Sequence, residues 1–343
     1  MSRLRTLSWD DSAGALVLLD QTRLPDQEVS VSCPDVDSVI DAIQRLVVRG
    51  APALGAAGAY GVVIAVRQGA REGWTHAELL NQIERLRQAR PTAVNLAWGV
   101  DRASTVIDAG HAAVLAEANA VANDDAEANR RLSELGARWI LDHVERRPLR
   151  VLTHCNAGAL ATTEYGTALG VVRSLHAQTP LEMVYADETR PLLQGSRLTA
   201  WELHRDGIPC QIQVDGAAAS TILRGLVDVV VIGADRIARN GDTANKIGSV
   251  GLALACQAAG IPFVVAAPWS TVDLDTVDGS AIPIELRDAA EVTQVGDQCF
   301  APPGVGAFNP AFDVTPAQYI AAIMTERGVL QPDGRTGLDG LLR

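Results

Sequence analysis

Five short apolar runs in the second half of the chain decide the fold: 149-LRVLTHC-155, 181-LEMVYAD-187, 208-IPCQIQVD-215, 228-DVVVIGAD-235 and 261-IPFVVAAP-268. Each run has the length and the apolar content of a buried strand. The segments between them have helical composition, at about residues 162–178, 196–206, 216–226 and 245–259. Because parallel strands need long crossovers, this alternation predicts an α/β fold with a doubly wound, Rossmann-like parallel sheet.

The stretch from Ile247 to Val272 carries no charged side chain and is longer than the roughly 20 residues that span a bilayer. Gly260, Pro262 and Pro268 interrupt this stretch, and residues of these two types mark turns. The sequence therefore predicts a helix, a turn and a buried strand here rather than a membrane span.

The first half of the chain has a different pattern. Two short strand-like pieces, 16–22 and 28–33, precede helical patterns at about residues 36–48, 53–68, 75–86 and 100–120. Asn123 and Asp124 are typical N-cap residues, so we expect a further helix from there to about His143. The sequence thus predicts a smaller, mainly helical N-terminal domain with short strands at residues 1–145 and a Rossmann-like catalytic domain at residues 146–343.

Composition excludes several classes of protein. The 343 residues include 29 basic and 41 acidic side chains, which gives a formal net charge of −12, and the basic residues do not cluster. A nucleic-acid partner or an anionic membrane surface is therefore not expected. The five cysteines are widely spaced without a Cys-x-x-Cys pair, which argues against a disulfide framework and a zinc site. No signal peptide is visible, so we expect a cytoplasmic protein.

Chemically useful side chains stand at the ends of the expected strands. Cys155, Asp187, Asp215 and Asp235 each end one of the apolar runs. In open parallel sheets, ligands bind outside the carboxyl ends of the strands, so these four positions indicate a site. Asp is also a common cap or turn residue after a strand, and Asp187 and Asp215 are equally explained as caps or as supporting partners. Neighbouring strand residues face opposite ways, which makes His154 a packed histidine rather than a partner of Cys155.

The sequence lacks the glycine patterns that hold dinucleotides and nucleoside triphosphates. Neither Gly-x-Gly-x-x-Gly after the first expected strand nor Gly-x-x-x-x-Gly-Lys-[Ser/Thr] is present. Lys246, in 240-NGDTANKIGS-249, is the only lysine of the chain. The presence of only one lysine is explained either by chance or by a need for a compact ammonium group at this position. We expect Lys246 in a polar turn at the start of a helix, where it would receive an oxyanion together with backbone N–H groups.

A second cationic feature lies in the first half. In 49-RGAPALG-55, Arg49 and Gly50 precede Ala51 and a proline, which suits the first turn of a helix. The free N–H groups at a helix N-terminus, together with a neighbouring guanidinium, form a phosphate-binding site. Arg90, in 90-RPTAVNLAWG-99, again precedes an expected helix. We therefore expect the N-terminal domain to contribute phosphate-binding residues.

Taken together, the motifs resemble the methylthioribose-1-phosphate isomerases of methionine salvage. The resemblance rests on RGAPALG, RPTAVNLAWG, LTHCNAGALAT, DETRPLLQGSRLTAWEL, GADRIARNGDTANKIGS and NPAFDVTP, in this order from about residue 49 to residue 316. Ribose-1,5-bisphosphate isomerases and the regulatory subunits of the eukaryotic initiation guanine-nucleotide exchange factor belong to the same superfamily. Fold alone does not separate these functions, because function depends on the site.

The resemblance implies a set of site residues. Cys155 and Asp235 would be the catalytic pair. The residues that would bind the sugar phosphate are Arg49, Gly50, Ala51, Arg90, Gln194, Asn245 and Lys246. The resemblance also implies a homodimer, no metal and no organic cofactor.

The chemistry of such a substrate fits these residue types. A furanose whose anomeric oxygen carries phosphate cannot open freely, so an acid must assist ring opening, and Asp235 is the candidate acid. Cys155 would then carry a proton from C2 to C1, or would stabilise a direct hydride transfer between them. The apolar residues after Cys155 favour direct transfer, because they offer little to stabilise a thiolate. The alternatives are an isomerase of another ribose 1-phosphate, such as ribose 1,5-bisphosphate, and a non-catalytic regulatory subunit.

Overall fold

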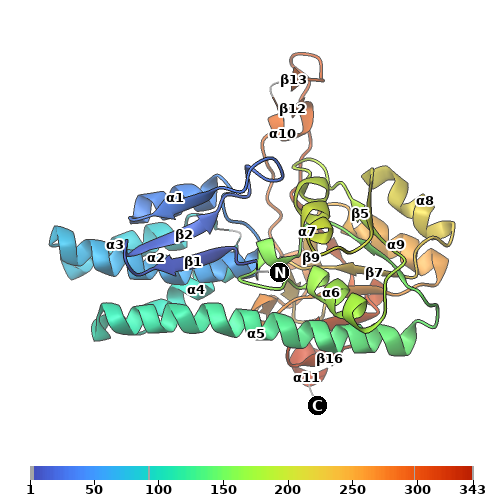
Figure 1. Cartoon of the computed structure of the whole chain (residues 1–343), viewed down its shortest axis with the longest axis horizontal. Coiled ribbons are helices and arrows are strands. Elements are labelled where there is room, and N and C mark those ends of the chain that lie inside the picture. Colours follow the sequence, from blue (N-terminus) through green and yellow to red (C-terminus); the bar gives the residue numbers. More distant parts are fainter. Residues whose placement is uncertain (1–3, 92, 297, 342–343) are drawn as a thin grey trace.

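The N-terminal part of the molecule consists of a small sheet and a group of helices. The computed structural model describes residues 4–91, 93–296 and 298–341. The first three strands form an antiparallel sheet, namely β1 (Leu7–Asp10), β2 (Ala15–Leu19) and β3 (Ser30–Cys33). The helices that follow are α1 (Val36–Gln44), α2 (Ala51–Glu72), α3 (His76–Arg87) and α4 (Val94–Ser104). This arrangement agrees with the expected mainly helical region with short strands (Figure 1).

Small residues bring α2 and α4 into close contact. A Cβ atom added at Gly99 would lie 1.9 Å from the carbonyl oxygen of Gly55, so the two helix backbones approach where only glycine fits. Almost every residue of α2 from Ala51 to Ala65 is buried. The N-terminus of this helix, which belongs to the expected phosphate-binding site, is thus fixed in the N-terminal core.

Helix α5 (His111–His143) corrects two predictions. The helix expected at residues 100–120 is interrupted between α4 and α5, where Gly110 has a φ of 86° and precedes the new helix. Asn123 and Asp124 lie inside α5 and do not cap a separate helix. Side chains of the first part of α5 belong to the N-terminal core, and those from Leu132 onward belong to the core around the large sheet. The division of the chain near residue 145 stays a prediction.

The second part of the chain folds around a seven-stranded sheet, and the expected α/β class is confirmed. Its strands are β4 (Arg150–Thr153), β5 (Met183–Asp187), β6 (Cys210–Gln213), β7 (Val229–Ile232), β10 (Phe263–Ala266), β15 (Ala322–Thr325) and β16 (Gly328–Leu330). The order across the sheet is β16-β15-β10-β7-β4-β5-β6, and all neighbours are parallel except β15 and β16. Without β16, this is the doubly wound order of a Rossmann fold.

Helices cover both faces of this sheet (Figure 1). They are α6 (Ala168–Gln178), α7 (Ala200–Arg205), α8 (Ala218–Leu223) and α9 (Ser249–Ala259). Successive β7 residues alternate between two cores: Val229 and Val231 pack with α5 and α6, whereas Val230 and Ile232 pack with α8 and α9. The uncharged stretch from residue 247 forms α9, a turn and β10, as predicted. In the described part of the chain, no helix combines the length and the apolar character needed to cross a bilayer.

A second, four-stranded sheet lies at the carboxyl ends of the large one. Its strands, in the order β11-β8-β9-β14, are β11 (Val272–Asp273), β8 (Arg236–Ala238), β9 (Thr243–Lys246) and β14 (Phe312–Thr315). Between β11 and β14 the chain forms a protruding strap that carries α10 (Ala290–Thr293) and the pair β12 (Gln294–Val295) and β13 (Gln298–Cys299) (Figure 1). The last helix is α11 (Leu338–Leu341).

The small sheet corrects the expected place of Lys246. This residue and Asn245 end β9, opposite Phe312 and Asp313 of β14, and α9 begins only at Ser249. The polar run before them resembled a helix start, but residues 243–246 pair with neighbouring strands instead. Lys246 therefore presents its ammonium from the end of a strand and not from the start of a helix.

Candidate active site

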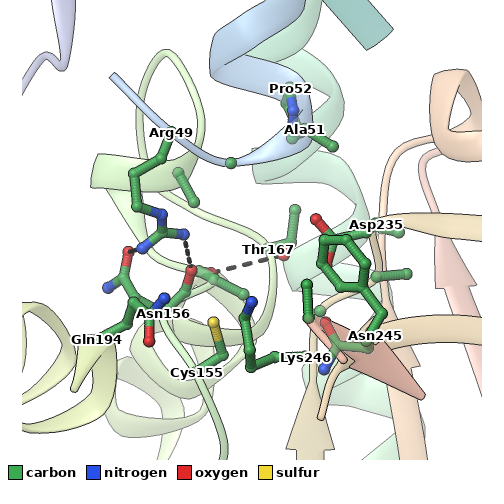
Figure 2. Close-up of a pocket in the computed structure, with 18 of the residues that line it drawn as sticks. Arg49, Ala51, Pro52, Cys155, Asn156, Thr167, Gln194, Asp235, Asn245 and Lys246 are labelled. Carbon is green, nitrogen blue, oxygen red and sulfur yellow. Dashed lines mark hydrogen bonds between the residues drawn. The ribbon is translucent and has the colours of Figure 1, made fainter. Parts of the chain in front are cut away.

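The pocket lies where the direction of the sheet connections changes. Strand β4 leads on to β5 on one side, and β7 leads on to β10 on the other, although β4 and β7 are direct neighbours. In such sheets the loops diverge at this point and leave a crevice. All nine site residues expected from the sequence line this one pocket: Arg49, Gly50, Ala51, Arg90, Cys155, Gln194, Asp235, Asn245 and Lys246. They come from both halves of the chain (Figure 2).

Cys155 follows β4 in an unusual backbone conformation. Its φ of 63° lies in the left-handed region, which costs a non-glycine residue of order 1 kcal/mol or more. Two threonines hold it there: the Cys155 N–H donates to Oγ1 of Thr189 at 2.8 Å, and Oγ1 of Thr199 donates to the Cys155 carbonyl at 2.6 Å. The result is a thiol aimed into the pocket from a fixed backbone (Figure 2).

The loop after Cys155 is organised by Glu202, a residue of α7 that the sequence analysis did not single out. Its buried carboxylate accepts hydrogen bonds from Asn156 Nδ2 at 2.9 Å and from the backbone N–H groups of Ala159 at 2.7 Å and Leu160 at 3.2 Å. Arg173 Nη2 lies 2.8 Å from the same carboxylate and compensates its charge. Glu202 thereby fixes the position of Asn156.

Asn156 in turn holds Arg49. The Arg49 guanidinium donates to the Asn156 side-chain oxygen at 3.0 Å and also to its carbonyl oxygen (Figure 2). Both acceptors are neutral, so the charge of Arg49 stays available to a ligand. The next residue, Gly50, has a φ of 92° and approaches Ala161 so closely that a Cβ atom would lie 2.4 Å from its carbonyl oxygen. Helix α2 then begins at Ala51, with its N-terminal end at the pocket.

Asp235 and Lys246 both line the pocket, and they lie at the two ends of the segment that forms β8 and β9. The Asp235 N–H donates to the carbonyl of Ala244 at 2.9 Å, which fixes the loop after β7 against β9. Desolvation raises the pKa of Asp235, and the opposing charges of Lys246, Arg49 and Arg90 do not offset this effect. Burial thus makes the protonated form of this carboxyl group more favourable than it is in water.

Lys246 is only 8% exposed, and desolvation lowers the pKa of its ammonium. Cys155 and Asp235 are the acidic groups that oppose this shift most, and the ammonium lies 4.6 Å from the centre of the Phe312 ring. The expectation that the surroundings of Cys155 offer little to stabilise a thiolate stays a prediction. Lys246, at the end of β9, is a basic group in the same pocket that this expectation did not consider.

Arg90, Glu285 and Arg287 form a charged group on another wall of the pocket. Arg90 Nη2 lies 3.8 Å from Glu285 Oε2, and Arg287 Nη1 lies 2.8 Å from Glu285 Oε1. Desolvation lowers the pKa of Arg90. Sequence reasoning missed Glu285 and Arg287, because they lie in the irregular strap, where no periodicity or motif marks them.

Two amides complete the polar lining. Gln194, which precedes a π-helical turn at Gly195–Thr199, is 5% exposed, and in the described part of the chain its Oε1 has no hydrogen-bond donor. A buried acceptor of this kind is costly unless a ligand hydroxyl satisfies it. Asn245 Nδ2 donates to Ser249 Oγ at 2.9 Å, which orients its amide.

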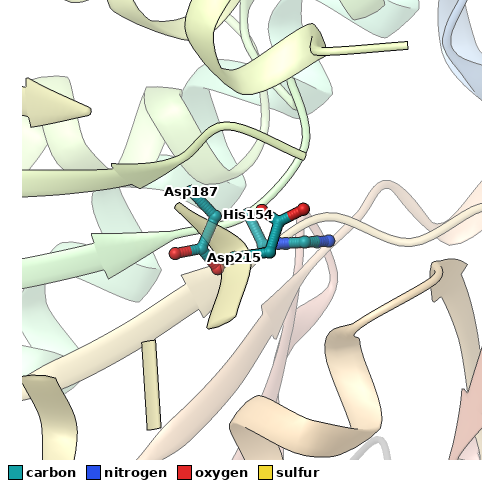
Figure 3. A group of neighbouring side chains, drawn as sticks. All are labelled: His154, Asp187 and Asp215. Atoms are coloured by element: carbon teal, nitrogen blue, oxygen red, sulfur yellow. Dashed lines mark hydrogen bonds and ion pairs between the residues drawn. The ribbon is translucent and has the colours of Figure 1, made fainter. Parts of the chain in front are cut away.

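His154 and two other residues at strand ends, Asp187 and Asp215, lie next to one another (Figure 3). His154 Nδ1 lies 2.9 Å from Asp187 Oδ2, and its Nε2 donates to the Ile247 carbonyl at 2.8 Å. Burial is the largest single influence and lowers the pKa of His154, but the hydrogen bond and charge of Asp187, the Ile247 carbonyl and Asp215 together raise it overall. Asp215 accepts from the N–H groups of Thr189 and Arg190 at 2.7 and 2.6 Å.

These three residues are the one group of described side chains that comes close enough to share a metal ion. Their ligand atoms, however, are engaged: both ring nitrogens of His154 and both oxygens of Asp215 form hydrogen bonds. His154 and Asp187 hold the backbone beside Lys246, and Asp215 holds the Thr189 loop that fixes Cys155. The expected packed role of His154 agrees with this geometry.

Fold and pocket together define a Rossmann-like α/β protein whose switch-point pocket offers an acid, a thiol and several cations to a small anionic ligand. Residues 47–332 match the initiation factor 2 subunit family. The chain belongs to this family.

Two relatives that carry the name of an isomerase are similar to nearly the whole chain. The chain is 52% identical to the methylthioribose-1-phosphate isomerase of Alkalilimnicola ehrlichii, over 99% of this chain and 98% of that protein. It is 51% identical to the protein of the same name from Thioalkalivibrio sulfidiphilus, over 99% and 97%.

Solved structures show the same fold under two names. The 5-methylthioribose 1-phosphate isomerase from Pyrococcus horikoshii has a TM-score of 0.85 at 38% identity, with 97% of this chain and 94% of that chain covered. The translation initiation factor eIF-2B, subunit delta, from A. fulgidus has a TM-score of 0.84 at 41% identity, with 99% of both chains covered. Because both names occur on one fold, the chemistry of the pocket has to distinguish an enzyme from a regulator.

Proposed function

We propose that this protein is an aldose–ketose isomerase that converts 5-methylthioribose 1-phosphate to 5-methylthioribulose 1-phosphate in methionine salvage. The observation that carries the proposal is one pocket in which Asp235, Cys155 and Lys246 meet Arg49 and Arg90. The named isomerases that match nearly the whole chain support it. A regulator that only binds a partner has no need for a protonated carboxyl, a thiol and a desolvated lysine in one pocket.

The phosphate is bound by the cationic side of the pocket. Arg49 keeps its charge free because its partners are neutral, and it stands directly before the N-terminus of α2. Helix N–H groups at Gly50 and Ala51 add donors there. Arg90 and Lys246 are desolvated cations whose pKa is lowered, and an anionic ligand restores a favourable setting for both.

Ring opening needs an acid, and Asp235 is placed to supply the proton. Burial raises its pKa, which favours the protonated form that a general acid needs. Protonation of the ring oxygen breaks the bond between this oxygen and C1, and the electron deficit that develops at C1 prepares it to receive hydrogen. During this step the sugar is held by Gln194, by Asn245 and by the residues that bind its phosphate.

Hydrogen then moves from C2 to C1, and the C2 hydroxyl gives its proton to the Asp235 carboxylate left by ring opening, so that C2 becomes the carbonyl carbon and the acid is restored. In one route the Cys155 thiolate takes the proton from C2 and returns it to C1; in the other, hydride passes directly between the two carbons. The apolar residues after Cys155 favour direct transfer, whereas Lys246, which lines the same pocket, offers the proton route a cation near the sulfur. Turnover in deuterium oxide separates the two routes.

The assembly and the location of the protein rest on the family resemblance. We propose a homodimer and a cytoplasmic enzyme, and sedimentation equilibrium of the purified chain tests the first of these. For the reaction, purified protein is mixed with 5-methylthioribose 1-phosphate, and formation of the ketose is followed by ³¹P and ¹³C NMR. Ketose formation supports the proposal, whereas a substrate that stays unchanged with folded protein refutes it.

A further inference from the structure

The charged side chains that line the pocket bear on which sugar phosphate it binds. This inference rests on the proposed function. Four cationic side chains line the pocket in the described part of the chain, namely Arg49, Arg90, Lys246 and Arg287. The carboxyl groups in the same lining are those of Asp235 and Glu285. Only some of the cationic charge is therefore available to a ligand.

Arg287 is already neutralised by two carboxylates. Its Nη1 is 2.8 Å from Glu285 Oε1, and its Nε is 2.8 Å from Glu291 Oε1, on the strap helix α10. The hydrogen bond to Glu291 raises the pKa of Arg287, as expected for a guanidinium held by acceptors. With Asp235 and Cys155 counted in their neutral forms, the four lining cations together with Glu285 and Glu291 carry a net charge of +2.

A net charge of +2 matches one phosphate monoester, which carries about −1.5 to −2 at neutral pH. A sugar bisphosphate brings about twice that charge, so its second phosphate finds no uncompensated cation among the described lining residues. Ionisation of Asp235 or Cys155 would lower the balance further and strengthen the same preference. The rest of the lining includes apolar side chains, such as Leu192, Pro268 and Phe312, against which an uncharged group packs favourably.

Glu285 is the residue whose charge sets this balance. Its Oε2 faces Arg90 Nη2 at 3.8 Å while Oε1 contacts Arg287, so it lies between two arginines that would otherwise receive a second anion. The backbone around it is fixed: the Ala311 N–H donates to the Glu285 carbonyl at 2.8 Å, and the Ile247 N–H donates to the Ala311 carbonyl at 3.1 Å. Glu285 thus has a defined position relative to Lys246.

We propose that Glu285 is a specificity-determining residue: its carboxylate, held between Arg90 and Arg287 in the pocket wall, rejects a second phosphate and selects a sugar monophosphate whose other end is uncharged. Discrimination of this kind acts by repulsion of the wrong ligand as much as by attraction of the right one. Glu285→Gln keeps the size and a hydrogen-bond acceptor but removes the negative charge. The site then attracts a bisphosphate more strongly.

The test compares two ligands on one protein. Inhibition constants are measured for ribulose 1,5-bisphosphate and for 5-methylthioribulose 1-phosphate, with wild type and with Glu285→Gln. The ratio of the two constants should shift toward the bisphosphate by about tenfold or more in the variant, and the shift should shrink at high salt. Equilibrium binding of the same two ligands gives the ratio independently of turnover.

Two control variants make the result specific. Glu285→Asp keeps the charge and should leave the ratio nearly unchanged. Glu182→Gln changes the net charge of the protein equally, but Glu182 is 44% exposed and pairs with Arg146 at the opposite end of the sheet, so the ratio should not move. An unchanged ratio in folded Glu285→Gln overturns the inference. Failure of the wild type to isomerise its substrate would instead refute the proposed function, while the binding ratio would still decide the role of Glu285.

Discussion

Replacement of the single lysine separates a ligand-binding role from a structural one, because the two roles predict opposite effects on stability. Lys246→Met keeps an unbranched chain of similar length and removes the ammonium. In the free protein this ammonium is 8% exposed and its pKa is lowered by desolvation, so it destabilises the folded state at neutral pH. The variant should therefore have a higher free energy of unfolding than the wild type.

Ligand binding should change in the other direction. A charge-assisted hydrogen bond to phosphate contributes about 1.5 to 3 kcal/mol, so Kd for 5-methylthioribulose 1-phosphate should rise by about 10- to 150-fold. Calorimetric titration measures Kd, and urea unfolding measures stability. Arg45→Met is the matched control, since Arg45, the C-cap residue of α1, has a side chain that is 60% exposed, and its loss should change neither quantity by more than about 1 kcal/mol. An unchanged Kd, or a protein less stable than wild type, would refute the assigned role of Lys246.

Two further changes test the loop after Cys155 and the hydrogen transfer. Glu202→Gln removes a buried charge that compensates Arg173 and holds Asn156, so the free energy of unfolding should fall by about 3 to 5 kcal/mol and ligand binding should weaken. The control is Glu182→Gln, which breaks an exposed ion pair and should lower the free energy of unfolding by about 1 kcal/mol or less in the same urea titration. Turnover in deuterium oxide should label the ketose at C1 if Cys155 carries the proton, and mass spectrometry of the product detects this label. An unlabelled product would support direct hydride transfer, and Cys155→Ser with wild-type activity would remove the thiol from both routes.

The sequence predicts five of the seven strands of the large sheet, because their signal is local, and it misses β15 and β16. Runs such as 228-DVVVIGAD-235 become strands buried on both faces, and such strands are recognisable from apolar content alone. The same logic places Cys155 and Asp235 together, since the carboxyl ends of neighbouring parallel strands meet at one edge. Arg49 and Gly50 are recognisable as well, because a helix that starts with proline has a marked beginning.

Other features depend on tertiary contacts that no local pattern carries. Lys246 was expected at a helix start, but pairing with β14, more than sixty residues later, makes it the end of a strand. Glu285 and Arg287 reach the pocket from an irregular strap, and Glu202 acts through a carboxylate whose partners lie about forty residues earlier. Such contacts depend on how elements pack, so residue type and spacing alone do not reveal them.

The most direct test of the account is the activity of Asp235→Asn, because the proposed chemistry needs a transferable proton at this position. The variant keeps the shape of the side chain, so Kd for the ketose should stay close to wild type while kcat falls by about 100-fold or more. The pKa of Asp235 is raised from its ordinary value of 3.8, so the folded wild type binds this proton more tightly than the unfolded chain. Wild-type stability should therefore decline as pH rises from about 4 through the folded-state pKa, and the variant should lack this decline.

Together, a kcat reduced by two orders of magnitude, a nearly unchanged Kd and the lost pH dependence are the predicted result. A folded Asp235→Asn enzyme that turns over 5-methylthioribose 1-phosphate at the wild-type rate would contradict the assignment of this pocket's acid, and with it the proposed mechanism.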